Sequence, residues 1–170
     1  MDFFDLIKTR CSMRVFTSQP IEDDKLQRIL ESINLAPSAG NLQAYEVYLI
    51  NRPEDRATLM QAAWDQAFVG QAPVVLVFCT NPARSAKYGA RGADLYCLQD
   101  ATIACTYAML AATALGLGSV WVGAFDDEAV WRALGSPHGQ RPVAMLPIGY
   151  PGREPKYRPR RSLKDLIHRL

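Results

Sequence analysis

The fold is decided by one long uncharged stretch, residues 101–125, which reads ATIACTYAMLAATALGLGSVWVGAF. On length alone it is able to cross a bilayer. However, Gly116 and Gly118 interrupt it, and residues 119–122 have the composition of a strand. The pattern predicts a buried helix from Asp94 to Leu115 followed by a buried strand, in place of a membrane-spanning helix. Because this helix is apolar almost all round, we expect it at the centre of the protein or of an assembly.

Helices and strands alternate along the rest of the chain. Helical spacing of apolar residues and capping residues predict helices over 2–9, 26–33, 54–64, 126–135 and 162–170, the last with a capping-box pattern of Ser162 and Asp165. Short apolar runs predict strands over 45–50, 74–79, 119–122 and 143–148. The run at 74–79 is apolar throughout, which indicates a strand covered on both faces. At 170 residues the chain fits a single domain, residues 1–170.

The net charge of +2 is unevenly distributed. Residues 152–170 contain seven of the 19 basic residues and two of the 17 acidic ones, so this segment carries +5 and the rest of the chain −3. Such a segment is typical of contacts with nucleic acid, an anionic membrane or a bound phosphate. Aromatic residues are sparse in it, and its arginines precede a capped helix, which argues against nucleic acid.

The cysteines and the first residues bear on the cellular compartment. Cys11, Cys79, Cys97 and Cys105 form no Cys-x-x-Cys pair and no zinc-ligand group with the two histidines, so we expect neither a metal nor a disulfide framework. The chain starts with acidic residues where a signal peptide is basic, and no long apolar segment follows. These features predict a cytoplasmic protein.

Several nucleotide-binding and hydrolytic motifs are absent from the sequence. The Gly-x-Gly at residues 116–118 follows a helix and precedes a strand, which is the reverse of the order in a dinucleotide-binding fold. Neither a P-loop nor a Gly-x-Ser-x-Gly motif occurs. His138 lies in a loop and His168 near the end of the chain, where histidines are usually solvated. A hydrolytic triad is therefore not expected.

Two basic clusters remain, one near each end of the chain. They consist of Arg10, Ser12 and Arg14 after the first helix and of Arg158, Arg160 and Arg161 before the last one. Arginine presents five donors in a fixed geometry that suits a phosphate dianion, and serine adds a hydroxyl. The two clusters either converge on one phosphate or form two solvated runs of charge, and composition leaves both interpretations open.

Five segments of the chain resemble, in their order and intervals, motifs of the nitroreductase family of FMN proteins. They are residues 10–16 (RCSMRVF), 36–43 (APSAGNLQ), 115–123 (LGLGSVWVG), 147–151 (PIGYP) and 158–161 (RPRR). The likeness covers nearly the whole chain, and five motifs in one order are hard to obtain by chance. The resemblance implies an α+β fold with a central mixed β-sheet flanked by helices, and a long buried central helix at a dimer interface.

The resemblance also implies that FMN is the bound cofactor and which residues hold it. Its phosphate and ribityl end would lie against Arg10, Cys11, Ser12, Arg14, Arg158 and Arg160. Pro37, Ser38, Ala39 and Asn41 would line the flavin from the partner subunit, mainly through their backbone. Trp121, Val122 and Gly123 would run under the ring, with a backbone N–H near flavin N5 and no Cβ on Gly123 to hinder the approach. Without the resemblance, residues 36–41 are a helix-ending turn and Trp121 is a core residue.

The activity implied by the resemblance is reduction of a small oxidised acceptor, such as a nitroaromatic or a quinone, by NAD(P)H in a ping-pong hydride transfer through FMN. Because the flavin supplies the chemistry, no catalytic side chain is expected. Two alternatives are a flavin-binding protein without turnover and a same-fold FMN enzyme of different chemistry, namely dehalogenation, azoline oxidation or flavin degradation. The expected assembly is a homodimer with residues 94–115 near its two-fold axis, without a nucleic-acid or membrane partner.

In one motif this chain departs from the family. Gln43 is followed by Ala44 and Tyr45, where many family members have Pro and Trp. We therefore expect the substrate side of the flavin to have a different shape.

Overall fold

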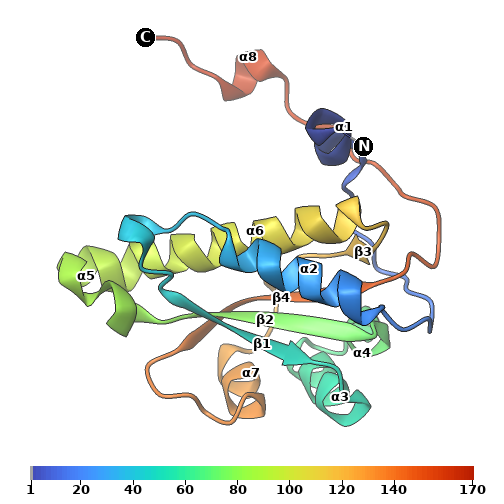
Figure 1. The fold of residues 1–170 in the computed structure, drawn as a ribbon, viewed down its shortest axis with the longest axis horizontal. Helices are drawn as coiled ribbons and strands as arrows, with labels where there is room; N and C mark the ends of the chain where they lie inside the picture. The colour runs from blue at the N-terminus through green and yellow to red at the C-terminus, as the bar shows by residue number, and fades with distance from the viewer. Residues whose placement is uncertain (1) are drawn as a thin grey trace.

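The computed structural model describes residues 2–170 as a four-stranded sheet with helices on both faces (Figure 1). The strands are β1 (Tyr45–Ile50), β2 (Val74–Thr80), β3 (Gly118–Ser119) and β4 (Arg141–Gly149), in the order β1-β2-β4-β3. The predicted α+β class is confirmed. The predicted mixed sheet is not what the structure has, because these four strands pair antiparallel. Parallel pairing is found at an isolated bridge between Ser12 and Ser119. The first loop touches the sheet edge at one residue pair without entering the sheet as a strand.

Strand β2 lies between two apolar layers. Successive side chains of a strand point to opposite faces. Val74, Leu76 and Phe78 pack with α2 (Asp23–Asn34) and α6 (Cys97–Ala114), whereas Val75, Val77 and Cys79 pack with α3 (Pro53–Ala62), α4 (Ala67–Gln71) and α7 (Asp127–Ala133). All seven residues of β2 are buried. The prediction of a strand covered on both faces is confirmed.

The central helix begins later than the sequence predicts. Helix α6 starts at Cys97 instead of Asp94, because one π-helical turn, η3 (Gly92–Tyr96), precedes it. Small buried residues face the sheet, whereas Leu98 and Tyr107, which are nine positions apart and so lie on opposite flanks of the helix, are 39% and 38% exposed. A single chain therefore leaves apolar side chains on both flanks of α6 partly uncovered. None of the helices in residues 2–170 is long and apolar enough to cross a membrane.

The strand predicted at 119–122 is interrupted. The register continues from the pair Ser119–Ile148 to a bridge between Val122 and Met145, but Pro147 lies opposite the intervening Val120. Proline has no N–H to donate, so the ladder lacks a bond at this point. The regular strand is therefore reduced to β3, while Val122 stays fixed to the sheet.

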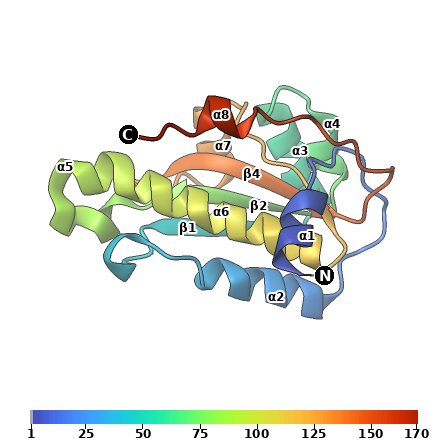
Figure 2. The same cartoon turned by 90° about the horizontal axis from the view of Figure 1, so that it is seen from above.

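Both ends of the chain lie on the side of the sheet that α6 covers (Figures 1 and 2). Helix α1 (Phe3–Thr9) is capped by Asp2, whose carboxylate accepts the Asp5 N–H at 2.9 Å, as predicted. Helix α8 (Leu163–Leu166) is capped by Ser162 but is shorter than predicted. Instead of completing a capping box, Asp165 pairs with Arg161 at 2.6 Å. Residues 151–170 are exposed throughout, so nothing in residues 2–170 covers the apolar side of α8.

Candidate functional site: a basic pocket and a pocket on α6

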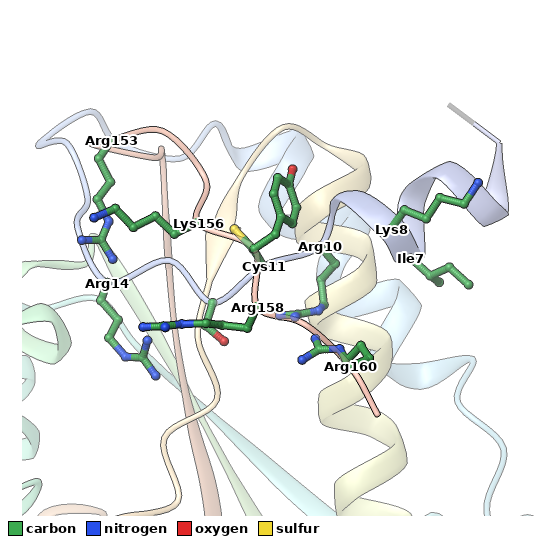
Figure 3. A pocket seen from close by; sticks show the side chains of 11 residues that line it. Ile7, Lys8, Arg10, Cys11, Arg14, Arg153, Lys156, Arg158 and Arg160 are labelled. Carbon is green, nitrogen blue, oxygen red and sulfur yellow. The ribbon is translucent and has the colours of Figure 1, made fainter. Parts of the chain in front are cut away.

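The largest hollow, about 810 Å³, lies between the loop after α1 and the C-terminal tail (Figure 3). We call it the basic pocket. It is lined by Ile7, Lys8, Arg10, Cys11, Ser12, Arg14, Arg153, Lys156, Tyr157, Arg158 and Arg160. Seven of these residues are cationic, and none is acidic. Unneutralised cations in one hollow produce a strong positive potential, which attracts a compact, multiply charged anion.

Backbone contacts bring the two ends of the chain together at this pocket. Met13 N–H donates to Ser119 O at 2.9 Å, which fixes the first loop to the sheet edge. Gly152 N–H then donates to Val15 O at 2.8 Å, and Phe16 forms a bridge with Pro151. A Cβ on Gly152 would lie 2.9 Å from Val15 Cγ1, so this close approach requires glycine. The tail therefore starts beside the first loop.

The basic pocket contains six of the residues that the sequence assigned to FMN: Arg10, Cys11, Ser12, Arg14, Arg158 and Arg160. Figure 3 shows Arg10 and Arg160 pointing toward one another from the two segments. Five of the six residues in the two charged clusters line this one pocket, whereas Arg161 pairs with Asp165 instead. That the five hold one phosphate stays a prediction. Sequence reasoning missed Ile7, Lys8, Arg153, Lys156 and Tyr157, although the charge of +5 on the tail was a signal for the basic ones.

A second hollow, about 630 Å³, lies where the segment after α2 meets the start of α6. We call it the α6 pocket. Its lining residues are Pro37, Ser38, Ala39, Tyr96, Leu98, Gln99, Asp100, Thr102 and Ile103. It contains three of the residues predicted to line the flavin from the partner subunit. Asn41, the fourth, lies at the end of η1 (Ala39–Asn41) and lines neither hollow.

Asp100 is the residue that holds the wall of the α6 pocket in place. It is 1% exposed, and its two carboxylate oxygens accept the N–H groups of Ala39, at 2.9 Å, and of Ala44, at 3.2 Å. Buried carboxylates are rare unless their oxygens are hydrogen-bonded, as they are here. Sequence reasoning missed this residue. The signal was a single acidic residue on a helix without other charges, residues 97–114.

The backbone of this wall turns sharply. Gly40, Asn41 and Gln43 have φ angles of 58°, 55° and 49°, in the left-handed region that favours glycine or asparagine. Ser38 stabilises the turn, because its Oγ accepts the Gln43 N–H at 3.0 Å. A Cβ on Gly40 would meet the hydroxyl end of the exposed Tyr88 side chain, which can shift, so the φ angle is what favours glycine at this position. The wall is therefore rigid backbone that presents few side chains.

The third predicted group, Trp121 to Gly123, lines neither hollow. Trp121 packs partly against the core, and Val122 is buried. Val122 N–H donates to Met145 O at 2.9 Å, so it is not free for a ligand. Gly123 is exposed, and a Cβ there would approach only the Trp121 indole, at 3.2 Å. Within residues 2–170 its N–H has no hydrogen-bond partner.

The two hollows lie at opposite ends of α6. Figures 1 and 2 place α1 beside the C-terminal end of α6 and α5 (Gly89–Arg91) at its N-terminal end. The basic pocket is lined in part by residues of α1, and the α6 pocket by residues at the start of α6. One chain therefore does not bring all the predicted site residues together. It presents two groups of them in separate hollows.

Comparison with known proteins identifies relatives along most of the chain. The model of a family described as "Nitroreductase family" matches residues 7–69 and 58–150. A putative NADH dehydrogenase/NAD(P)H nitroreductase of Archaeoglobus fulgidus is 32% identical, over 96% of this chain and 95% of its own. A 5,6-dimethylbenzimidazole synthase of Rhodobacter capsulatus is 29% identical, over 86% and 82%. Among solved structures, the NADPH:FMN oxidoreductase of Vibrio harveyi complexed with NAD+ superimposes with a TM-score of 0.90 at 28% identity, over 98% of this chain and 76% of its own.

Proposed function

The chain belongs to the nitroreductase family, and we propose that it is an FMN-dependent oxidoreductase that takes reducing equivalents from NAD(P)H. The acceptor in this proposal is a small oxidised molecule such as a nitroaromatic or a quinone. Donor and acceptor use the same cleft in turn, which gives a ping-pong mechanism. The similarity to relatives named as NAD(P)H nitroreductase and NADPH:FMN oxidoreductase supports this assignment.

The observation that carries the proposal is the composition of the basic pocket. A phosphate monoester is close to a dianion at neutral pH, and it offers three acceptor oxygens. Seven cations and the Ser12 hydroxyl face this hollow without a competing carboxylate, so the donor set fits the phosphate end of FMN. In the proposal, Arg10 and Arg160 hold the phosphate, and Ser12 and Cys11 lie toward the ribityl chain.

The ring would lie beside the Trp121–Gly123 segment. Since Val122 N–H already donates to Met145, the N–H groups of Trp121 and Gly123 are left as donors in this segment, and we assign that of the exposed Gly123 to flavin N5. Gly123 is exposed, and its missing Cβ would meet only the Trp121 side chain, which supports this role. The sequence placed Trp121, Val122 and Gly123 under the ring. The proposal assigns the contact with flavin N5 to the backbone N–H of Gly123.

A homodimer is part of the proposal. If two chains pair antiparallel along the exposed side of α6, the basic pocket of one chain lies near the α6 pocket of its partner. Three features support such pairing: the two hollows at opposite ends of α6, the partly exposed Leu98 and Tyr107, and the uncovered side of α8. Pro37, Ser38 and Ala39 would then complete the site of the other subunit.

When bound, FMN would supply the hydride-transfer chemistry between donor and acceptor. The protein residues bind and orient: the cations hold the phosphate, and N–H groups near the ring stabilise negative charge as it develops there. His138 and His168 lie outside both hollows, and Asp100 is engaged with two backbone N–H groups. No acid or base from this chain is therefore assigned to the reaction.

A second candidate function is FMN chemistry of another kind on the same fold. The similarity to a 5,6-dimethylbenzimidazole synthase favours this alternative, which includes flavin degradation. A flavin-binding protein without turnover is the remaining alternative. The three candidates share the phosphate site and differ in what happens to the ring.

The test is anaerobic stopped-flow mixing of the FMN-loaded protein with NADH and with NADPH. We expect bleaching of the visible flavin band by at least one donor, and recovery of the band when a quinone is added. Binding of FMN without bleaching would overturn the oxidoreductase assignment and leave the binding protein, whereas consumption of the flavin would favour degradation. Sedimentation of the same sample tests the assembly, because a stable monomer that retains FMN would contradict the dimer.

A further inference from the structure

A second basic surface borders the α6 pocket. The segment formed by η2 (Pro82–Tyr88), α5 and η3 contains Arg84, Lys87 and Arg91 and a single acidic residue, Asp94. Arg84 donates to Leu42 O, which ties it to the wall of the α6 pocket. We name the remaining group, Lys87, Tyr88, Arg91 and Tyr96, the cation–tyrosine platform.

The two cations of the platform rest on its two tyrosine rings. Lys87 Nζ lies 5.0 Å from the centroid of the Tyr88 ring. Arg91 Cζ lies 5.4 Å from the centroid of the Tyr96 ring, and Arg91 Nε donates to the Tyr96 hydroxyl at 3.0 Å. The two rings meet edge to face, with centroids 5.2 Å apart. Cation–π contacts hold the charges in place but do not neutralise them.

No carboxylate in residues 2–170 forms an ion pair with Lys87 or Arg91. Both side chains are exposed. The platform is also firmly supported, because a Cβ on Gly92 would lie 2.2 Å from Ser85 O, and Ser85 Oγ donates to Gly92 O at 2.9 Å. The supporting turn, η3, is π-helical, a conformation frequent at functional sites. The platform is therefore a fixed pair of positive charges beside aromatic rings.

Its position separates it from the proposed site of the FMN phosphate. Tyr96 belongs both to the platform and to the α6 pocket, where the flavin of the other subunit would lie. The basic pocket is at the opposite end of α6 (Figures 1 and 2). An anion bound by the platform is therefore not the FMN phosphate. In the proposed dimer it lies at the outer edge of the cleft that the nicotinamide of the donor must enter.

We propose that the cation–tyrosine platform binds the 2′-phosphate of NADPH and makes NADPH the preferred donor. This inference rests on the proposed function. In NADPH the 2′-phosphate sits on the adenosine ribose, at the end of the molecule remote from the nicotinamide, so it reaches a surface outside the ring pocket. Arg91 and Lys87 supply the charge, and the Tyr88 ring offers a face for the adenine. NADH lacks the phosphate and gains nothing from these charges.

The experiment compares the double variant Lys87→Gln/Arg91→Gln with Arg28→Gln, which removes an exposed cation from α2. Both are loaded with FMN and mixed with each donor in the stopped-flow instrument. In the double variant we expect the apparent Kd for NADPH to rise by about tenfold or more, a change of about 1.4 kcal/mol per factor of ten. The FMN content and the Kd for NADH should stay at wild-type values. Arg28→Gln should change none of the three.

Calorimetric titration of the FMN-loaded protein with 2′,5′-ADP and with 5′-AMP gives a readout independent of turnover. We expect 2′,5′-ADP to bind more tightly to the wild type and to lose this advantage in the double variant. Equal affinity for both nucleotides in the wild type, or equal losses for NADPH and NADH in the variant, would overturn the proposal. If neither donor bleaches the flavin but the preference for 2′,5′-ADP depends on Lys87 and Arg91, the proposed function fails and the platform site stands.

Discussion

The basic pocket and the α6 pocket are built in opposite ways. The first is formed mostly by exposed side chains of the end of α1, the loop after it and the C-terminal tail, and backbone bonds fix the points where loop and tail attach to the sheet and to each other. The second has a wall of backbone in left-handed conformations, fixed by the buried Asp100. Substitutions in the basic pocket should therefore change ligand affinity. Substitutions of the residues that support the wall of the α6 pocket should change the free energy of unfolding.

The largest effect should come from Asp100→Ala. The change leaves two backbone N–H groups without their acceptor, and each such loss costs about 1–3 kcal/mol. We expect the free energy of unfolding, from urea denaturation at fixed protein concentration, to fall by about 2–5 kcal/mol. Asp100→Asn should lose about half as much, because its amide oxygen still accepts one bond.

Asp94→Asn is the matched control for this carboxylate. Asp94 is exposed and lies on the turn that leads into α6, so its substitution should leave stability nearly unchanged. Equal stability of the Asp100→Ala and Asp94→Asn variants would mean that the wall holds itself without the carboxylate.

The second effect concerns the arginines at the two ends of the chain. Replacing Arg10 or Arg160 by Gln should weaken FMN binding by about tenfold or more, because each charge-assisted bond contributes about 1.5–3 kcal/mol. Riboflavin lacks the phosphate, so its affinity should barely change. Since both side chains would contact one dianion, their effects should be non-additive. Titration of the apoprotein with both flavins at constant ionic strength measures this.

Lys164→Gln serves as the control, since Lys164 is an exposed cation of the same tail and does not line the pocket. If Arg10→Gln weakens FMN and riboflavin equally, the arginines support folding and the phosphate lies elsewhere.

A smaller and more local effect is expected for Gly123→Val. The new side chain meets only the Trp121 indole within the chain, so folding should be little affected. It would intrude where the ring is proposed to lie, so FMN occupancy should fall by more than stability does. Thermal unfolding and the flavin-to-protein absorbance ratio separate the two quantities. A variant with full FMN and normal turnover would show that this segment lies away from the ring.

The smallest expected effect concerns chemical labelling of the cysteines in the wild-type protein. Burial raises the pKa of the Cys79 thiol to about 12 and also raises the pKa values of Cys97 and Cys105, so these thiols stay protonated and unreactive. Cys11 is half-buried in the basic pocket. We expect iodoacetamide to modify one thiol of the folded protein, Cys11, and FMN to slow the reaction.

Mass spectrometry of digested peptides identifies the labelled thiol, and Cys11→Ser provides the blank. Labelling of Cys11 at the same rate with and without FMN would contradict its place beside the cofactor.

The same comparison explains what the sequence predicted. Elements defined by local apolar periodicity, such as β2 and the helix around Ile29 and Ile33, lie where the pattern indicated, because burial on known faces determines them. The strand at 119–122 was overpredicted, since its interruption depends on Pro147 in another strand. Helix α8 was overpredicted because its apolar side finds nothing to pack against within residues 2–170.

The sequence predicted only those residues of the candidate site that lie in local sequence motifs. The clusters at residues 10–14 and 158–160 were visible as charge, but their meeting depends on contacts between residues far apart, such as Gly152 with Val15. Asp100 was missed because the partners of its carboxylate lie about 60 positions earlier in the chain. The role of each site residue toward FMN stays a prediction.

The joining of the first loop to the tail, through Val15 and Gly152, has a consequence for how the pocket forms. Its cations come from segments about 150 positions apart, so the pocket forms only after the sheet between them has brought the segments together. A variant truncated after residue 151 would keep all four strands but lose four of the seven cations, and we expect it to fold its sheet without acquiring the colour of flavin.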